Sequence, residues 1–503
     1  DMAPIRFIYV RNLISRTVNG TFQELSFAVR VLNIGHGKRV AIHWCGEDGN
    51  WRESPADFRC TLAGGDEVWV ADLALPLTMD TSIPGNIQFA ACLERGEEQY
   101  WDSRFGSNYQ SDADSGVIVF EPVDVRVTGC RPHLPAAMVS LPLEVAVRQE
   151  IEAEAVTIHW TTDGWATAQT TPAYFRRDHW DRSAGSNARN PNRYGWGIWA
   201  ARLLLPQAYR VEFAVECRTR SGAVWDNHGG GNYRVQRDTL KVLTLNLHTW
   251  QEEDAAAKLA TVARAIRERR IDLVCLQEVG EDWNDGAGDW ATNAARILND
   301  QLPRPYHLHA DWSHLGFDRY REGAAILSRH PFGATDAGYV SDSADPYDIH
   351  SRKVVMAQVR VPFMGVLNVF SVHLSWPADG FYPQFDRLHR WAQERRTPDI
   401  AGTLLCGDFN IAAGSEAFRH IVETGAYEEQ MLKIRRPAEF HRVFRDEPRT
   451  DSMQALAGDG RIDFIWLDAG SRLRAIAAEE LFTPGVYGRV SDHTGYLVEF
   501  ELR

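Results

Sequence analysis

The chain has 503 residues, of which 44% are hydrophobic and 24% charged, and its formal net charge is −14. The length exceeds what a single core usually supports, the composition is that of a soluble globular protein, and no uncharged apolar run reaches the roughly 18 residues that a membrane-spanning helix needs. The acidic balance argues mildly against long nucleic acid as an obligate partner.

The first 237 residues contain an internal repeat. The segment Ile42–Trp44 returns as Ile158–Trp160, and the segment Trp101–Tyr109 returns as Trp225–Tyr233. Each copy consists of short β-type runs separated by turn residues, which is typical of a β-sandwich. The second copy has extra residues around Asn187–Trp199, which we interpret as a loop insertion.

The repeat and a change of composition near Thr239 predict a multi-domain chain. We expect two all-β immunoglobulin-like sandwiches followed by a larger α/β domain, with boundaries at 1–121, 122–237 and 238–503. The seven cysteines are an odd number, and Cys275 and Cys406 lie in apolar runs that predict buried thiols. Spacing leaves open whether disulfides form among the N-terminal cysteines Cys45, Cys60, Cys92 and Cys130.

Strands alternate with helical patterns after Thr239, and some neighbouring strands have no helix between them, so we expect a mixed sheet. The predicted strands are Lys241–Leu247, Ile271–Val279, Gly323–Ser328, Val354–Val361, Val366–Leu374, Thr403–Cys406, Arg461–Leu467 and Tyr496–Glu501. Helical spacing occurs from Leu259 to Ile266 and around Ala291–Gln301, Phe385–Glu394 and Glu416–Glu423. Two such sheets packed face to face, with helices outside, is the architecture we expect.

Acidic, amide and imidazole side chains stand at the ends of these apolar strands, where an unpaired buried charge is costly. Carboxylate and amide oxygens are the ligands that Mg²⁺ prefers, so a shared cation would explain them. The residues are Asn246, Glu278, His373, Asp408, Asn410, Asp463, Asp492 and His493.

Taken in order, the motifs TLN, QE, GAAILSR, SVHL, GDFN, RIDFIW and SDH resemble the endonuclease/exonuclease/phosphatase superfamily, which includes DNase I-like nucleases and sphingomyelinases. The resemblance covers nearly all of Lys241–Arg503 and implies a four-layer α/β sandwich with the site at the mouth between two sheets. The chain has Gly460–Phe464 where inositol-polyphosphate 5-phosphatases carry a PAWCDR-type motif, which argues against that subgroup.

The resemblance also implies roles. Asn246, Glu278 and Asp492 would hold or adjoin a Mg²⁺ ion, with Mn²⁺ or Ca²⁺ as alternatives. His493 would activate water or contact the phosphate, oriented by Asp463. Asp408 and Asn410 would position the nucleophile and the leaving-group oxygen. His373 would donate to a non-bridging phosphate oxygen.

Two features beside these motifs have two interpretations each. Arg352 and Lys353 precede a strand and form either a phosphate-contacting pair or a solvated strand start. An aromatic-rich loop follows His373 and is either a packed lid or a surface for lipid, base or sugar. Its aromatic residues are Trp376, Phe381, Tyr382 and Phe385.

The repeated Trp-Asp…Asn-Tyr segments resemble the signature of starch- and glycogen-binding modules of carbohydrate-binding family 21. Aromatic faces stack on glucose rings, and Asn and Asp bond the hydroxyls. The candidate sugar-binding residues are Trp51, Trp101, Asn108, Trp165, Trp225, Asn227, Asn232 and Tyr233. The alternative is that each segment is only a sandwich corner with a core Trp.

We therefore expect a Mg²⁺-dependent phosphoester hydrolase that tandem modules tether to α-glucan or a similar polysaccharide, with diesters favoured over monoesters as its substrates. Its substrate could be a lipid headgroup, a nucleic acid or a phosphorylated sugar. The alternatives are a DNase I-like nuclease, or a sugar-binding scaffold with a non-catalytic hydrolase-like domain. The residues after Asp1 show no basic and apolar leader pattern, so we expect no secretory leader within this sequence, and a secreted and a cytoplasmic location both stay open, as does the oligomeric state.

Overall fold

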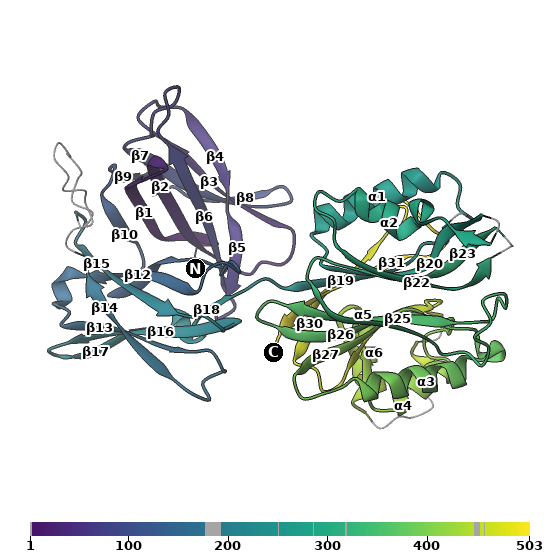
Figure 1. Ribbon diagram of the computed structural model, residues 1–503. Helices are drawn as coiled ribbons and strands as arrows, with labels where there is room; N and C mark the ends of the chain where they lie inside the picture. The colour runs from purple at the N-terminus through teal and green to yellow at the C-terminus, as the bar shows by residue number, and fades with distance from the viewer. Residues whose placement is uncertain are drawn as a thin grey trace. The chain divides into compact units, whose positions relative to one another are not determined.

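The computed structural model describes residues 3–176, 193–249, 251–284, 286–316, 319–446, 453–456 and 458–503. The chain divides into two compact units, Asp1–Arg237 and Asp238–Arg503 (Figure 1). The first unit is mostly β-structure, and the second combines strands with helices.

Two sheets build the first half of the N-terminal unit, with strand orders β10-β1-β2-β6-β5 and β4-β3-β7-β8, and β9 pairs with β7. Apolar side chains of alternating positions on β1, β2, β3 and β7 form its core, as expected for strands buried on one face. The strands are β1 Ile5–Thr17, β2 Gly20–Val31, β3 Lys38–Cys45, β4 Trp51–Pro55, β5 Asp57–Thr61, β6 Glu67–Pro76, β7 Ile87–Arg95, β8 Glu98–Asp102, β9 Tyr109–Ser111 and β10 Gly116–Val119.

The second half repeats this β-structure as the path β11-β12-β15-β14-β13-β16-β17, with β18 paired to β16. The strands are β11 Val125–Cys130, β12 Ser140–Arg148, β13 Ala155–Thr161, β14 Gln169–Phe175, β15 Trp196–Leu204, β16 Arg210–Thr219, β17 Gly222–Asp226 and β18 Tyr233–Gln236, with the 3-10 turns η1 Gln149–Ile151 and η2 His228–Gly230. The expected loop insertion at Asn187–Trp199 is therefore wrong at its C-terminal end, because Trp196–Trp199 belongs to β15 and pairs with β12. Residues 187–192 lie outside the described residues.

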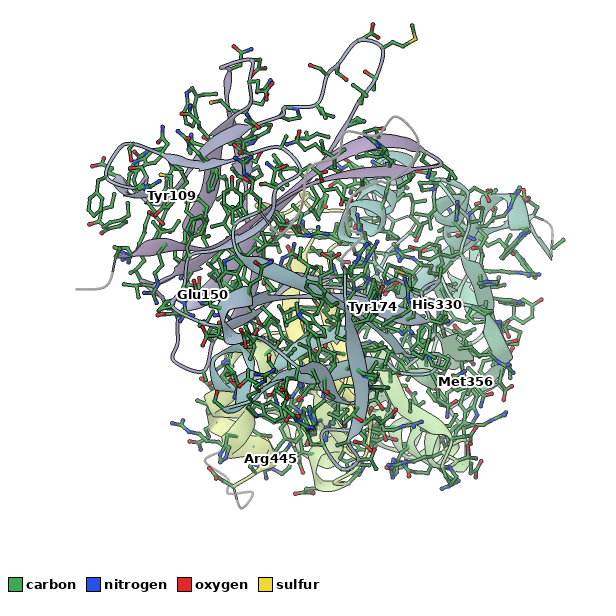
Figure 2. The ribbon with its side chains drawn as sticks, turned by 90° about the vertical axis from the view of Figure 1, so that its left-hand side faces the viewer. Tyr109, Glu150, Tyr174, His330, Met356 and Arg445 are labelled. Carbon is green, nitrogen blue, oxygen red and sulfur yellow. The ribbon has the colours of Figure 1, made fainter. Side chains whose placement is uncertain are left out.

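The Trp-Asp…Asn-Tyr segment of the first half links neighbouring strands through its Asp side chain, and we call this arrangement a clamp. The Asp102 carboxylate accepts the backbone N–H of Phe7 (2.8 Å) and the hydroxyl of Tyr109 (2.7 Å), and Tyr109 is labelled in Figure 2. One carboxylate thus joins β8 to β9 and to the distant strand β1.

The second half repeats the clamp with matching partners. The Asp226 carboxylate accepts the backbone N–H of Val127 (2.8 Å) and the hydroxyl of Tyr233 (2.7 Å). Arg126 completes it with an ion pair to Asp226 at 3.5 Å and another to Glu121. The Asp and Tyr of the repeated signature therefore bond the protein itself and join neighbouring strands in both halves.

We expect the Tyr233→Phe substitution to lower the free energy of unfolding of the N-terminal unit by about 1–2 kcal/mol, because Asp226 loses a hydrogen bond in a buried network. Scanning calorimetry of the full chain would show this as a lower midpoint for that unit. Tyr174 is 63% exposed on β14 (Figure 2), so Tyr174→Phe is the matched control. Equal midpoints for the two variants would contradict the clamp.

The cysteines form no disulfide, since all seven are free thiols. Cys275 and Cys406 are fully buried, as the apolar runs around them predict. Cys60 and Cys130 are partly exposed, and Cys45 and Cys92 are buried in the first half of the N-terminal unit.

The first sheet of the C-terminal unit has the order β22-β23-β20-β19-β31-β30, and β21 pairs with β20. Its strands are β19 Leu240–Asn246, β20 Leu273–Asn284, β21 Ala287–Gly288, β22 His307–Gly316, β23 Tyr320–Ser328, β30 Leu473–Leu481 and β31 Gly495–Leu502. Helices α1 (Ala255–Arg269) and α2 (Ala294–Asp300) lie over one face of this sheet (Figure 1), with the 3-10 turn η3 (Trp290–Thr292) ahead of α2.

The second sheet has the order β24-β25-β26-β27-β29-β28. Its strands are β24 Phe332–Tyr339, β25 Lys353–Val361, β26 Gly365–His373, β27 Ile400–Asp408, β28 Tyr427–Glu429 and β29 Asp463–Asp468. The helical segments beside it are η4 Pro377–Asp379, α3 Phe381–Glu394, α4 Glu416–Glu423, α5 Gln430–Arg435 and α6 Pro437–Phe444. Figure 1 shows α3 and α4 on the side of this sheet away from β19 and β20.

The two sheets of this unit contact each other through small polar side chains. The Gln277 amide on β20 donates to the Ser371 hydroxyl on β26 (3.0 Å), and that hydroxyl donates to the carbonyl of Leu276 (2.9 Å). Both side chains are fully buried, so these bonds fix the position of β20 against β26. The strand ends that carry polar residues are thereby brought to one edge.

Every strand and helix predicted for this unit is present, with both strand pairings, parallel and antiparallel, in each sheet. The sequence patterns did not predict β22, β24, β28, β30, α5 and α6. Some of these elements are short, and the others mix buried and exposed positions. In the described parts of the chain, no helix combines the length and apolar composition needed to cross a membrane.

Candidate active site

The chemistry-bearing side chains gather because strand ends meet. Parallel strands β26 and β27 place His373 opposite Asp408, and antiparallel β29 begins at the same edge with Asp463 opposite Asp408. On the other sheet, β19 ends at Asn246, where its parallel pairing with β20 also ends, and Glu278 follows the paired Gln277 on β20. This is the convergence that apolar strands ending in polar residues predict.

An irregularity of β20 sets the direction of the Glu278 side chain. The register of β20 against β23 shifts between Leu276 and Val279, and Glu278 has a φ of 47°, in the left-handed region that few non-glycine residues adopt. A bulge of this kind turns a side chain out of the regular alternation of the strand. Here it directs Glu278 to Asn246, whose amide donates to the Glu278 carboxylate at 2.9 Å.

Asp408 is at the centre of the constellation. Its Oδ2 accepts from the Asn246 amide at 3.1 Å and lies 3.6 Å from His373 Nε2 and 3.7 Å from His493 Nε2. His373 Nε2 also lies 3.8 Å from Glu278 Oε1. One carboxylate thus touches residues of both sheets.

His493 is held by Asp463. Its Nδ1 is 2.7 Å from Asp463 Oδ2, which leaves Nε2 directed at Asp408. Burial lowers the pKa of His493, but the hydrogen bond and charge of Asp463, with Asp408 and Asp492, outweigh burial and raise the pKa to about 9. A carboxylate on Nδ1 also fixes the tautomer and orientation of the ring.

The remaining pKa shifts arise because several buried acidic side chains lie close together. Burial and then the charge of Asp463 raise the pKa of Asp408 to about 8. Burial raises the pKa of Asp463, and burial with the charge of Glu322 raises that of Glu278. His373 has its pKa lowered well below the usual value by burial and by the nearby Arg352 cation, so it is neutral.

The donor set fits a hard cation. Glu278, His373 and Asp408 present ligand atoms close enough together to share one ion, and so do Asp408, Asp463 and His493. Asp463 Oδ1 is buried and has no hydrogen-bond partner among the described residues. Buried carboxylate oxygens with raised pKa values and unmet bonding capacity are what a divalent ion would satisfy.

These residues line one pocket of about 620 Å³. Of the residues predicted from sequence, the pocket wall contains Glu278, Arg352, His373, Asp408, Asn410, Asp463, Asp492 and His493. The Asn410 amide donates to the carbonyl of Leu374 (2.7 Å), and its backbone N–H donates to Asp408 (2.9 Å). Asp492 lies at the exposed rim, with Oδ1 3.9 Å from His493 Nε2.

Two of the predicted site residues, Asn246 and Lys353, have contacts that differ from those expected of a metal ligand and a phosphate-binding residue. Asn246 is fully buried, and its side-chain oxygen accepts the backbone N–H of His248 (3.0 Å), so its nitrogen faces the carboxylates. Lys353 lies outside the pocket wall, pairs with Asp311 at 3.2 Å and stands over the ring of Tyr339. Arg352 alone of the predicted pair reaches the site.

Sequence reasoning missed Glu322 and His314, which line the pocket and lie 3.2 Å apart. Both are buried, at 8% and 2% exposure. The available signal was the charged residue just ahead of the apolar run in REGAAILS. His314 stands on β22, a strand that was not predicted.

The candidate sugar-binding residues of the N-terminal unit fall into two groups. The indoles of Trp51, Trp101, Trp165 and Trp225 are 37–50% exposed, so the alternative of a core Trp at 101 and 225 is wrong. Trp101 packs on His43 with ring centroids 4.8 Å apart, and Trp225 packs on His159 at 4.9 Å.

The polar members of that set bond the protein itself. Asn108 and Asn232 both have φ near 60°, and their backbone N–H groups close turns onto Ser103 (2.9 Å) and Asn227 (2.8 Å). The Asn227 side chain accepts the N–H of Gly230 at 3.0 Å. Asparagine suits such left-handed turn positions.

The Asp463→Asn substitution should lower the pKa of His493 from about 9 towards its ordinary value, because the hydrogen bond and charge that raise it are lost while burial remains. Proton-detected titration of the histidine ring signals in metal-free protein would measure this. His420 lies 2.8 Å from the exposed Asp386, so Asp386→Asn is a control that should leave the His493 titration unchanged. An unshifted His493 in the Asp463→Asn protein would contradict the pairing.

Comparison with known proteins gives two family matches and several similar structures. Residues 242–493 match the Endonuclease/Exonuclease/phosphatase family, and residues 144–236 match the Carbohydrate/starch-binding module of family 21. An endonuclease/exonuclease/phosphatase family protein from Leptotrichia buccalis is 23% identical over 52% of this chain and 100% of its own, with a TM-score of 0.43. One from Beutenbergia cavernae is 20% identical over 53% and 72%, with a TM-score of 0.41.

A mannosyl-6-phosphatase from Bacteroides thetaiotaomicron is 13% identical over 52% of this chain and 100% of its own, with a TM-score of 0.37. A comparison with curated protein sequences gave no match. The family name covers enzymes that hydrolyse phosphoester bonds, and the matched segment begins just before Asn246 and ends at His493. The chain therefore belongs to the endonuclease/exonuclease/phosphatase family and carries a family-21 starch-binding module ahead of that domain.

Proposed function

We propose that the C-terminal unit is a divalent-metal-dependent phosphoester hydrolase that the N-terminal modules tether to α-glucan. The observation that carries this proposal is the convergence of Glu278, His373, Asp408, Asp463 and His493, from both sheets, on one pocket. A divalent cation supplies charge neutralisation for the phosphoryl group when bound. Mg²⁺ is the expected ion, because the donor set is dominated by carboxylates, with Mn²⁺ or Ca²⁺ as alternatives.

The residues that would hold the cation are Glu278 and the rim residue Asp492. Asn246 would fix the Glu278 carboxylate through its amide nitrogen, since its oxygen is already bonded to the backbone of His248. This differs from the sequence-based role of Asn246 as a ligand. Arg352 would bind a phosphate oxygen, and Asn410 would position the leaving-group oxygen.

The pKa directions support a division of the proposed proton chemistry. His493 is held in its charged form by Asp463, which suits a donor to a phosphate oxygen. The pKa of Asp408, about 8, suits a base that takes a proton from the attacking water near neutral pH. Neutral His373 would donate to a non-bridging oxygen.

A phosphodiester is the proposed ester class, because the simple RIDFIW motif resembles the sphingomyelinase-like and small nuclease branches. The finer fold assignment is part of the same proposal: two immunoglobulin-like sandwiches, the first also sugar-binding, precede a four-layer DNase I-like sandwich. The domain boundaries would be 1–121, 122–237 and 238–503.

Release of p-nitrophenol from bis-p-nitrophenyl phosphate tests the hydrolase proposal. Activity should disappear with EDTA and return with Mg²⁺, because the acids of the pocket need a bound cation to accept an anionic substrate. Circular dichroism in EDTA controls for unfolding. Activity that persists fully in excess EDTA would overturn the metal dependence.

Glucan tethering is tested on the exposed indoles. Trp225→Ala should weaken binding to insoluble starch by roughly tenfold, because a sugar ring loses its stacking surface. Co-sedimentation with starch measures this, and Trp290→Ala in the C-terminal unit, where Trp290 is 49% exposed, is the control. Unchanged sedimentation of the Trp225→Ala protein would remove this residue from the proposed sugar site.

A further inference from the structure

The pocket offers few cations to an anionic substrate. The Arg352 guanidinium lines it and donates to the Ser375 hydroxyl (3.3 Å), and among the residues that the structure describes no carboxylate forms an ion pair with Arg352. Arg461 also lines the pocket, but it is paired with the fully buried Glu429 at 2.8 Å. Within the described wall, Arg352 is thus the single arginine or lysine whose charge is available to a phosphate.

The same wall is rich in acids. Glu278, Glu322, Asp408, Asp463 and Asp492 all line the pocket. One bound divalent ion would compensate for part of this charge and bind one phosphate. A second phosphate on the substrate would have to lie beside the remaining acids, and like-charge contacts select against a ligand, although His493 pairs with Asp463 and His314 with Glu322. The wall therefore favours a substrate with a single phosphate.

Apolar surface forms another part of the same pocket. Trp376 and Ile349 line it, and they are 49% and 50% exposed. They come from the two loops that follow β24 and β26, so the chain brings them together only in the folded unit. Of the aromatic-rich loop, Phe381 and Phe385 are fully buried in the core, which leaves Trp376 as its pocket-facing member.

The backbone beside these apolar side chains is anchored by two buried serines, Ser375 directly before Trp376 and Ser351 two residues after Ile349. Ser375 is 1% exposed, and it donates its N–H to the Gln384 side chain (2.8 Å). Ser351 is fully buried, and its hydroxyl donates to the carbonyl of Asp345 (2.7 Å). These bonds fix the chain segments that carry Trp376 and Ile349 to the body of the unit.

We propose that the substrate of this site is a phosphate ester of an uncharged sugar, with the sugar ring stacked on Trp376 and packed against Ile349. This inference rests on the proposed hydrolase function and specifies its substrate. A sugar ring has an apolar face for the indole and hydroxyls for the polar side chains of Gln251 and Thr494, which also line the pocket. Extended polyanions are disfavoured by the acids of the wall, and Trp376 and Ile349 face a pocket rather than a flat membrane.

The test compares substrates that differ in ring and charge. Glucose 6-phosphate carries one phosphate on a ring, glycerol 3-phosphate lacks the ring, and glucose 1,6-bisphosphate adds a charge. Each is supplied as the phosphomonoester and as its methyl diester, with Mg²⁺, beside sphingomyelin vesicles and a single-stranded oligonucleotide. We expect kcat/KM to be highest for a glucose 6-phosphate form and at least roughly tenfold lower for the other substrates.

Substitutions of Trp376 separate effects on substrate binding, seen in KM, from effects on the chemical step, seen in kcat. Trp376→Ala should raise KM for the glucose 6-phosphate form by roughly tenfold with little change in kcat, whereas KM for the glycerol ester should stay the same. Trp376→Phe should restore most of the loss. Trp290, equally exposed at 49% but outside the pocket wall, gives the matched control Trp290→Ala.

Faster hydrolysis of the bisphosphate, the vesicles or the oligonucleotide would overturn the sugar proposal, and so would an equal KM change for ring and glycerol esters in Trp376→Ala. If no ester, including bis-p-nitrophenyl phosphate, is hydrolysed, the hydrolase proposal fails by itself. Calorimetry of glucose 6-phosphate binding then decides the sugar proposal, because saturable binding that Trp376→Ala weakens supports it and the lack of such binding overturns it.

Discussion

The His493→Ala variant is expected to hydrolyse bis-p-nitrophenyl phosphate about 10²–10⁴-fold more slowly than the unmodified chain, with an unchanged fold. The imidazole is held by Asp463 at 2.7 Å and presents Nε2 to the pocket 3.7 Å from Asp408. Its removal takes away a cation next to the phosphate and leaves the Asp463 and Asp408 carboxylates without this counter-charge. The loss should appear mainly in kcat, because the charge acts where the transition state gains negative charge.

His441→Ala is the matched control, since His441 is an exposed histidine on α6 of the same unit and lies outside the pocket wall. Initial rates at saturating Mg²⁺ should distinguish the two variants, with circular dichroism to show that both are folded. A His493→Ala protein as fast as the control would remove His493 from the catalytic machinery. Inactivity of the unmodified chain and of both variants would instead favour a sugar-binding scaffold.

The Arg461→Ala variant should lose about 3–5 kcal/mol of stability in the C-terminal unit, the largest effect expected of a residue outside the chemistry. Glu429 is fully buried, and Arg461 is its only ion-pair partner among the described residues, at 2.8 Å. The guanidinium also lies over the ring of Phe464, 4.8 Å from its centroid. Its loss leaves a buried carboxylate that accepts only backbone N–H groups among the described residues, those of Met431, Leu432 and Ile465.

Scanning calorimetry on the full chain would measure this, with a fall of about 2–4 °C in the midpoint of the C-terminal unit for each kcal/mol lost. The midpoint of the N-terminal unit should not move. Arg442→Ala on the exposed face of α6 is the control and should change stability by less than about 0.5 kcal/mol. Adding Glu429→Gln to Arg461→Ala should recover part of the loss, and no recovery would refute the ion-pair explanation.

The sequence by itself determined the elements whose patterns are local. Uninterrupted apolar runs predicted the buried strands β19, β20, β25, β26 and β27, because a strand covered on both faces needs apolar residues at every position. The position of polar residues at the ends of those runs predicted which side chains would meet. The repeat predicted two related β-modules, since repeated segments fold alike.

The elements and contacts that depend on partners could not be read from such patterns. Strands β22 and β24 have mixed burial, so their periodicity is weak, and His314 on β22 was missed with them. The bulge that turns Glu278 towards Asn246 depends on the register against β23.

Only the tertiary structure decided which of the adjacent side chains Arg352 and Lys353 lines the pocket. It also decided which side chains of the repeated Trp-Asp…Asn-Tyr segment are exposed. Arg352 reaches the pocket, while Lys353 is taken up by Asp311. Trp101 and Trp225 are exposed, while the Asp and Tyr beside them clamp strands. The physical reason is that these outcomes depend on partners between 7 and 99 residues away, such as Asp311, which is 42 residues from Lys353, and local sequence does not encode their distance in space.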